Sequence, residues 1–159
     1  MPTKVKEVGV GDKAPGFSAQ DETGRTWSMK ALKGKTVVLY FYPRDNTSGC
    51  TQEGLDFSEL NAQFKKAKAV VLGISPDSVE SHEKFKKKMA FSFDLLSDPD
   101  QKVCKLYDAW KEKSMYGRKY MGVERSTFLI DGKGVLRHEW RKVKVKGHAE
   151  AVLAAVKSL

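Results

Sequence analysis

The stretch that decides the fold reads TVVLYFYPRDNTSGCTQE and covers residues 36–53. Its first part, residues 36–42, is continuously apolar and β-rich, which is typical of a strand buried on both faces of a sheet. Pro43 ends this strand, because proline cannot donate a backbone hydrogen bond to a neighbouring strand. After it, apolar side chains recur at helical spacing, at Phe57, Leu60, Phe64 and Ala67. We therefore expect a helix over residues 49–66.

The other segments alternate in type along the chain, without internal repeats or a low-complexity linker. Polar turn sequences between β-rich runs predict hairpins, at residues 16–19 with 26–28 and at 127–130 with 135–140. Further strands are expected at residues 69–75 and 94–97, and further helices at 29–32, 78–88, 101–110 and 147–159. This order predicts an α/β, thioredoxin-like fold: a central mixed β-sheet flanked by helices, with an N-terminal β-hairpin. A length of 159 residues suits one such domain over residues 1–159.

The composition excludes several classes of protein. No apolar run approaches the roughly twenty residues needed to span a bilayer, and residues 1–11 have no apolar core followed by a small-residue cleavage site. We expect a soluble, cytoplasmic protein. Two cysteines do not make a disulfide scaffold, and no Cys/His cluster has metal-ligand spacing. The three histidines are scattered, and we interpret them as surface or helix-end residues rather than metal ligands: His82, His138 and His148.

The net charge of +9 raises the question of an anionic partner, because basic proteins often bind nucleic acid or membranes. The lysines and arginines fall in separate clusters, at residues 65–68, 84–88, 111–119 and 141–146. No nucleic-acid-binding motif accompanies them, so we interpret the clusters as solvated helix faces and strand ends. Binding to nucleic acid is the weaker alternative, and we expect neither a nucleic-acid nor a membrane partner.

Cys50 stands where the buried strand meets its helix. A cysteine in the first turn of a helix faces unpaired backbone N–H groups and the positive end of the helix dipole, which favour the reactive thiolate. Thr47, three residues earlier, is expected to hold its hydroxyl near the sulfur, and Pro43 closes the loop. A buried, inert thiol is the alternative for any single cysteine. The loop context favours the nucleophile.

Pro43, Thr47 and Cys50 form the pattern Pro-x-x-x-Thr-x-x-Cys, which resembles the active-site motif of the peroxiredoxins. The wider string at residues 41–51, with Glu53, is similar to the peroxiredoxin Q group, also called bacterioferritin comigratory proteins. Further similar stretches follow in the family's order, at residues 11–17, 73–77, 95–98 and 122–131 and at Ser81, His82 and Phe85. The resemblance thus covers most of the chain from residue 11 to residue 131.

The resemblance implies a thiol peroxidase and supplies two further site residues. Arg125 matches the family's arginine before the apolar strand, which stabilises the thiolate and polarises the peroxide. Glu53, one turn after Cys50, orients Arg125 by the same analogy, and a purely structural Arg125–Glu53 pair is the alternative.

The implied reaction reduces hydrogen peroxide or organic hydroperoxides in antioxidant defence, while the Cys50 thiolate becomes a sulfenic acid. It needs no metal, haem or flavin, so no cofactor is expected. Thioredoxin or a low-molecular-weight thiol is the implied reductant, and the group's members are often monomers.

The chain departs from the family pattern at three positions. Two places where relatives carry a second, resolving cysteine hold Leu55 and Lys86 instead. Ser48 replaces the proline that often precedes the Gly-Cys pair, and serine is a good helix N-cap. A thioredoxin-like disulfide reductase is a rival class, but it would place a cysteine where this chain has Thr47.

Cys104 is the only other thiol. It borders an apolar face at helical spacing, formed by Val103, Leu106, Tyr107 and Trp110. We interpret it as a core residue. A resolving role is the disfavoured alternative, since a disulfide needs the two Cα atoms within about 7 Å, and an intermolecular disulfide is the third. The sequence therefore predicts a one-cysteine cycle, in which an external thiol attacks the sulfenic acid of Cys50.

Overall fold

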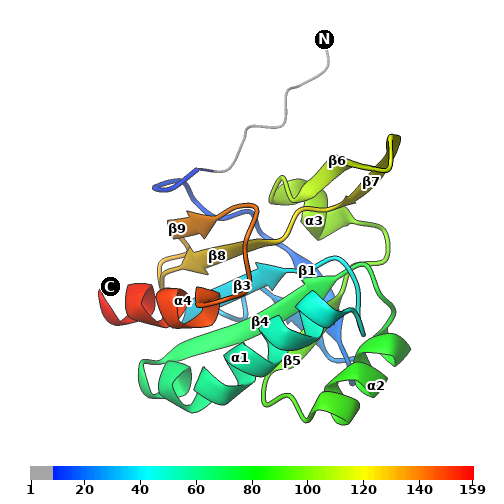
Figure 1. The fold of residues 1–159 in the computed structure, drawn as a ribbon. Helices are drawn as coiled ribbons and strands as arrows, with labels where there is room; N and C mark the ends of the chain where they lie inside the picture. Colours follow the sequence, from blue (N-terminus) through cyan, green and yellow to red (C-terminus); the bar gives the residue numbers. More distant parts are fainter. Residues whose placement is uncertain (1–8) are drawn as a thin grey trace.

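A computed structural model describes residues 9–159. They form a seven-stranded mixed sheet, helices that pack on both of its faces, and a separate two-stranded hairpin (Figure 1). In spatial order the sheet consists of β2 (Thr26–Ser28), β1 (Ser18–Asp21), β5 (Asp94–Ser97), β4 (Ala69–Ser75), β3 (Thr36–Phe41), β8 (Ser126–Ile130) and β9 (Leu136–Trp140). The helices are α1 (Ser48–Lys66), α2 (Val79–Met89), α3 (Lys102–Leu106) and α4 (His148–Lys157). The hairpin consists of β6 (Trp110–Met115) and β7 (Arg118–Val123).

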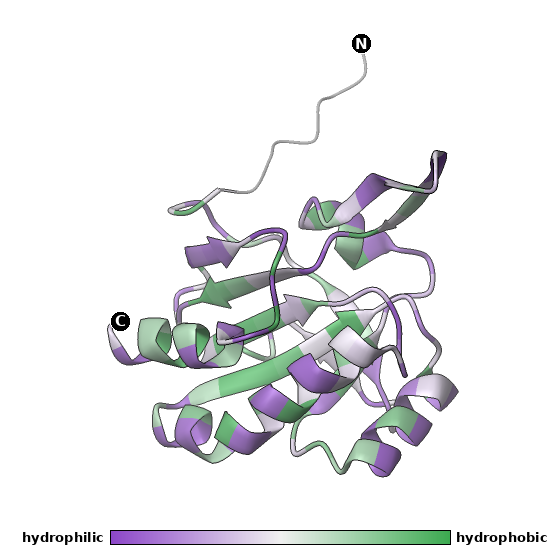
Figure 2. Ribbon diagram, viewed as in Figure 1, coloured by the Kyte–Doolittle hydropathy of each residue, from purple (hydrophilic) through white to green (hydrophobic). Residues whose placement is uncertain are grey.

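Strand β3 lies inside the sheet, parallel to β4 and antiparallel to β8. Its consecutive side chains point to opposite faces and are buried on both, as the continuous apolar run predicts. Val37 and Leu39 belong to one hydrophobic core, whereas Val38 and Tyr40 belong to another. The apolar strands β4 and β8 run through the middle of the molecule (Figure 2). The sheet thus separates two cores.

One face of the sheet packs against three helices, through residues such as Phe57 of α1, Phe85 of α2 and Val152 of α4. The other face packs against α3 and the segment before β3. We call the core under α1, α2 and α4 the first core and the core under α3 the second. Cys50 belongs to the first core and Cys104 to the second, so the sheet lies between the two thiols. None of the helices within residues 9–159 is long and apolar enough to cross a membrane.

The predicted mixed α/β sheet and both hairpins are confirmed, but one predicted helix is wrong and another is shorter than predicted. Residues 29–32 form successive turns that end at Gly34, whose φ of 91° lies in the left-handed region. The helix predicted over residues 101–110 stops at Leu106, because Asp108 has a φ of 54°. The backbone N–H of Ala109 then returns to the carbonyl of Cys104 at 2.8 Å.

Hairpin β6–β7 was not predicted, because the lysines of residues 111–119 indicated only a solvated charge cluster. Trp110 instead starts β6, and the two strands pair with each other and with no other strand among the described residues. Tyr116 and Gly117 form the turn, with φ values of 53° and 76°. Two positive φ values suit a tight turn whose twist matches that of its strands.

Candidate active site

Cys50 is the third residue of α1 and is only 2% exposed. The helix begins where predicted, but its N-cap is Thr47 rather than Ser48, and no side chain caps it. The first turn of α1 contains no acidic residue. The N–H groups and dipole at this helix end therefore act on the sulfur without a competing carboxylate in that turn.

Arg125 directly precedes β8 and contacts Cys50, which lies in the first turn of α1. Its Nη2 donates to Cys50 Sγ at 3.3 Å, and its Nη1 donates to Glu53 Oε1 at 2.6 Å. The Arg125 carbonyl accepts from the backbone N–H of Val143 at 3.0 Å, which holds the backbone of the arginine. A Cβ on Gly49 would lie 3.2 Å from Arg125 Nη2, so glycine before Cys50 leaves room for the guanidinium.

Glu53 is 1% exposed, and its Oε2 has no hydrogen-bond partner among the described residues. Burial raises the pKa of Glu53 to about 7, although the charge of Arg125 and its hydrogen bond act in the opposite direction. Burial also acts to lower the pKa of Arg125, but the effect of Glu53 and Cys50 is larger, so the pKa of the arginine is raised. One permanent cation is therefore shared between a thiol and a carboxyl group that titrates near neutrality.

Thr47 and Pro43 lie in the loop between β3 and α1. The Thr47 hydroxyl donates to the backbone carbonyl of Arg44 at 3.0 Å, and within residues 9–159 it makes no hydrogen bond to Cys50. Direct contacts therefore join Cys50, Glu53 and Arg125, whereas the predicted role of Thr47 at the sulfur stays a prediction.

A buried polar network that was not predicted from the sequence holds this loop from behind. Asp45 accepts from the Tyr42 hydroxyl at 2.7 Å and from the Ser81 hydroxyl at 2.7 Å, and it pairs with His82 Nδ1 at 2.8 Å. His82 Nε2 lies 2.8 Å from the Leu96 carbonyl, which can only accept. Both ring nitrogens thus have a partner, and the network fixes the imidazole from two sides.

His82 was interpreted as a surface or helix-end residue. It does lie near the start of α2, but it is not a surface residue, because its side chain is fully buried in this network. Asp45, Asp77 and His82 lie close enough together to hold a metal ion. Each already has a protein partner, since Asp77 accepts from the Ser75 hydroxyl and the Asp45 N–H. We assign the cluster to holding the loop. Asp45 inside the loop string, together with Ser81-His82 in the resemblance, was the signal available.

The other two histidines differ from each other. His138 is exposed on β9, as interpreted, whereas His148 begins α4 but is buried. Its Nε2 lies 2.7 Å from the Thr127 hydroxyl. Burial, together with the charge of Arg125, lowers the pKa of His148 to about 4, so it is neutral at physiological pH.

Cys104 has a different environment from Cys50. It is fully buried in the second core, and its backbone N–H donates to Asp98 Oδ2 at 2.9 Å. Burial and the neighbouring Asp98 carboxylate raise the pKa of the Cys104 thiol far above its ordinary value. A thiol in this setting stays protonated.

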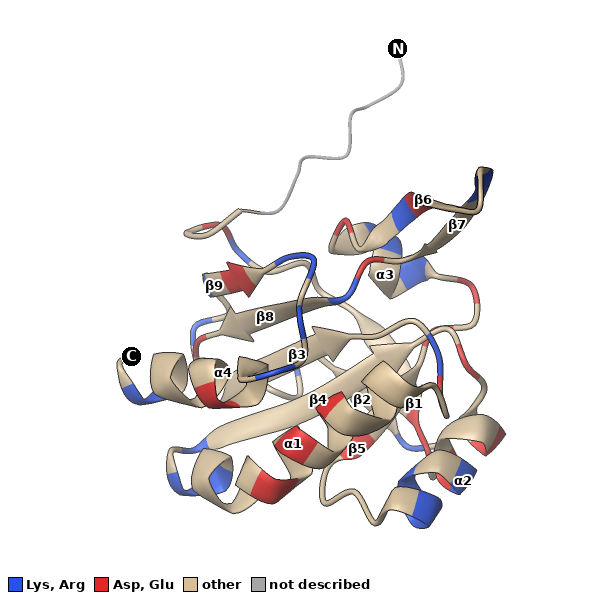
Figure 3. Ribbon diagram, in the orientation of Figure 1, with Lys and Arg blue, Asp and Glu red and all other residues tan. Residues whose placement is uncertain are grey.

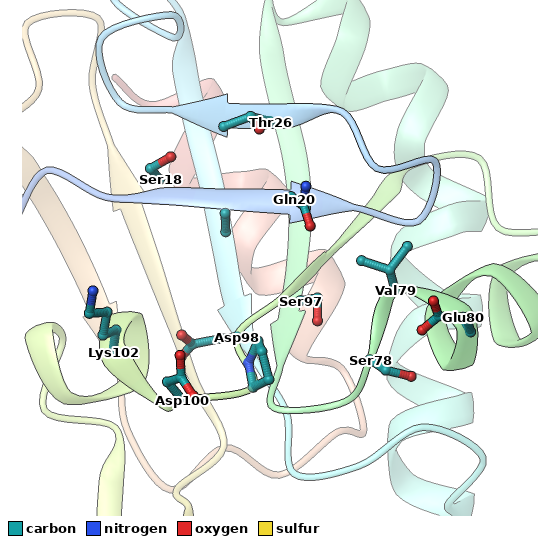
Figure 4. Close-up of a pocket in the computed structure, with 12 residues that line it drawn as sticks. Ser18, Gln20, Thr26, Ser78, Val79, Glu80, Ser97, Asp98, Asp100 and Lys102 are labelled. Atoms are coloured by element: carbon teal, nitrogen blue, oxygen red, sulfur yellow. The ribbon is translucent and has the colours of Figure 1, made fainter.

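A cavity of about 490 Å³ lies away from both thiols (Figure 4). It is lined by β1, by the start of α2 at Ser78 and by the segment around Asp98 that follows β5. Neither cysteine nor Arg125 lines it. This cavity is therefore not part of the thiol site.

Comparison with known proteins agrees with this geometry. The AhpC/TSA family model matches residues 10–139. The chain is 52% identical over 135 residues to Peroxiredoxin Bcp of Xanthomonas campestris, covering 85% of this chain and 84% of the relative. It is 47% identical over 152 residues to Peroxiredoxin Bcp of Bacillus subtilis, covering 96% and 97%.

The fold agrees equally well with a solved structure of the Xanthomonas campestris bacterioferritin comigratory protein, studied for its alkyl peroxide reduction activity. The TM-score is 0.86 at 48% identity, over 89% of this chain and 90% of that one. The thioredoxin-like fold is thereby confirmed. The chain belongs to the AhpC/TSA family, in its peroxiredoxin Bcp or Q group, and is a thiol peroxidase.

Proposed function

We propose that Cys50 is the nucleophile of this thiol peroxidase and that Arg125 stabilises the charge during the reaction. The observation that carries the proposal is the hydrogen bond from Arg125 Nη2 to Cys50 Sγ at 3.3 Å, with Nη1 fixed by Glu53. A guanidinium held in this way keeps its charge and its direction, so little reorganisation is needed as the reaction proceeds.

In the oxidation step, the Cys50 thiolate attacks the terminal oxygen of hydrogen peroxide or an organic hydroperoxide. An S–O bond forms as the O–O bond breaks, and the leaving oxygen takes up a proton and departs as water or an alcohol. The peroxide gains two electrons, and Cys50 becomes a sulfenic acid. No metal or organic cofactor takes part in this scheme.

Thr47 and the backbone N–H of Cys50 hold the peroxide in this proposal. Because the Thr47 hydroxyl already donates its single proton to the Arg44 carbonyl, it is left to accept a hydrogen bond from the peroxide O–H. Pro43 fixes the start of the loop and adds no competing donor. Glu53 orients Arg125 rather than touching substrate.

In the reduction step, an external thiolate attacks the sulfenic sulfur, forms a mixed disulfide and releases water after protonation. A second thiol then frees Cys50. Thioredoxin or a low-molecular-weight thiol is the proposed reductant, and the proposed place of the reaction is the cytoplasm, with the chain acting as a monomer. The position of Cys104 behind the sheet supports this one-cysteine cycle.

The proposal is tested by treating the protein with one equivalent of hydrogen peroxide in the presence of dimedone, which traps sulfenic acids. Mass spectrometry of peptides should find the adduct on Cys50, and pre-treatment with excess peroxide should replace it by the sulfinic form. An adduct on Cys104 alone would contradict the assignment of the nucleophile.

A further inference from the structure

Hairpin β6–β7 projects beyond the edge of the sheet and leads at its base directly into the active site (Figure 1). Glu124 and Arg125 follow β7, and the N–H of Glu124 is fixed by the carbonyl of Ala109 at 2.7 Å. Lys113 and Arg125 line one cavity of about 370 Å³. A molecule that lies along the hairpin therefore also reaches Arg125, whose Nη2 donates to Cys50 Sγ.

The two faces of the hairpin differ in charge, because side chains alternate along each strand and cross-strand partners share a face. The register pairs Lys111 with Gly122, Lys113 with Tyr120 and Met115 with Arg118. We call these six residues the inner face. It contains three cations and no carboxylate.

The inner face contributes Lys111 and Lys113 to the cavity that Arg125 also lines. A Cβ on Gly122 would touch Lys113 Cδ at 3.3 Å, so the lysine side chain lies across this face. Burial and the charge of Arg125 lower the pKa of Lys113, while Cys50 acts in the opposite direction, as expected for a lysine beside both groups. On the opposite face, Trp110 and Val123 pack on the core, and Glu112 pairs with Lys119 at 3.7 Å.

The hairpin also concentrates exposed apolar side chains. Of the eight large hydrophobic residues exposed within residues 9–159, four belong to it: Met115, Tyr116, Tyr120 and Met121. Tyr116, at the tip, is 99% exposed. Exposed Tyr and Met beside Arg are the composition of a protein interface rather than of an ordinary solvated surface.

We infer that the inner face of hairpin β6–β7 is the docking surface for an acidic protein that supplies the reducing thiol. Its six-residue strands give a surface about 20 Å long, more than a small thiol covers. Lys111 pairs with Asp108 at 2.8 Å, whereas Lys113 and Arg118 have no carboxylate partner among the described residues. These two cations favour a negatively charged partner, and blue segments lie along the hairpin in Figure 3. This inference rests on the proposed function, since only an oxidised Cys50 requires a reductant.

The test uses neighbouring residues of equal charge on opposite faces, Arg118 and Lys119. Turnover of hydrogen peroxide is measured with an acidic thioredoxin, thioredoxin reductase and NADPH, and in parallel with dithiothreitol. Arg118→Glu should raise the KM for thioredoxin about tenfold and weaken its increase with salt, whereas Lys119→Glu should change the KM less than about twofold. The dithiothreitol reaction should be unchanged in both variants.

A second matched pair tests the apolar contacts. Tyr120→Ser on the inner face should weaken the reaction with thioredoxin, whereas Met121→Ser on the opposite face should not. Equal effects within either pair would overturn the inference, as would a wild-type protein that consumes peroxide with dithiothreitol but not with thioredoxin. A dimer in solution that Tyr116→Ser dissociates would also overturn it, because a second copy would then cover the hairpin. Failure with both reductants would instead contradict the proposed function.

Discussion

Cys50 and Cys104 occupy equivalent positions, each as the third residue of a helix and each buried, but their charged neighbours have opposite signs. Arg125 donates to Cys50 Sγ, whereas the Asp98 carboxylate accepts from the N–H groups of Val103 and Cys104. The helix end at Cys104 is thus already neutralised by an anion. A cysteine at a helix N-terminus is therefore not reactive by its position alone, and the nearby charge decides.

The largest effect is expected from exchanging the thiols themselves. Cys50→Ser should abolish peroxide consumption with dithiothreitol, because a serine hydroxyl is not ionised at neutral pH. Cys104→Ser should retain most of the activity, with some loss of stability from the buried hydroxyl. Circular dichroism of both variants provides the folding control. Substantial turnover by Cys50→Ser, or complete loss in a folded Cys104→Ser, would break the comparison.

Removing the cation should make the surroundings of Cys50 more like those of Cys104. Arg125→Ala should slow the second-order reaction with hydrogen peroxide roughly 10²-fold or more, the scale of losing one preorganised donor. Rapid-mixing kinetics measures this step without a reductant. Since Arg125→Ala also leaves Glu53 buried without its partner, the double variant with Glu53→Gln controls for a charge defect. An unchanged rate in either variant would remove Arg125 from the reaction.

Glu53 should make the stability of the active-site region depend on pH. Its pKa in the folded protein is about 7 against an ordinary value of 4.5, so between these values the folded state binds the proton more tightly. The free energy of unfolding should therefore fall as pH rises through this window, by on the order of 2 to 3 kcal/mol relative to Glu53→Gln. Urea unfolding at pH 5 and pH 8 measures the difference. Parallel pH profiles for the two proteins would show that Arg125 keeps Glu53 ionised throughout.

The smallest effect is expected at Asp98. Asp98→Asn should cost on the order of 1 kcal/mol, because the amide is a weaker partner for the N–H groups of Val103 and Cys104. Burial is the first cause of the raised pKa of Cys104, so its thiol should stay resistant to iodoacetamide in the folded variant. Peptide mapping after native alkylation measures this. Rapid labelling of Cys104 in Asp98→Asn would instead make the carboxylate the dominant cause.

Peptide mapping without reductant extends the comparison to the two thiols together. After one equivalent of peroxide we expect no stoichiometric Cys50–Cys104 disulfide, because the thiols belong to cores on opposite faces of the sheet. Such a disulfide, together with thioredoxin-driven turnover lost in Cys104→Ser, would make Cys104 the resolving cysteine while leaving the peroxidase assignment intact.

Much of this protein is determined by local sequence patterns. The apolar run before Pro43 predicts a doubly buried strand, and the spacing of Phe57 and Phe64 predicts the helix that presents Cys50, because burial repeats with the period of each element. The motif around Cys50 likewise indicates the family, since its residues are close in sequence. Arg125 and Glu53 could be named only through the resemblance.

Only the tertiary structure decided which distant segments are in contact. It also decided where a helix ends and a strand begins. Cys50 and Arg125 are 75 positions apart in the sequence, and Asp45 and His82 are 37 apart, so no local pattern signals either contact. Asp108 ends α3 through a left-handed backbone, and the lysine-rich residues after it form strands because Trp110 and Val123 anchor the hairpin on the core. Charge alone does not distinguish a solvated loop from a strand, because lysine side chains reach water from either. Only the register shows that Lys111, Lys113 and Arg118 share one face of this hairpin.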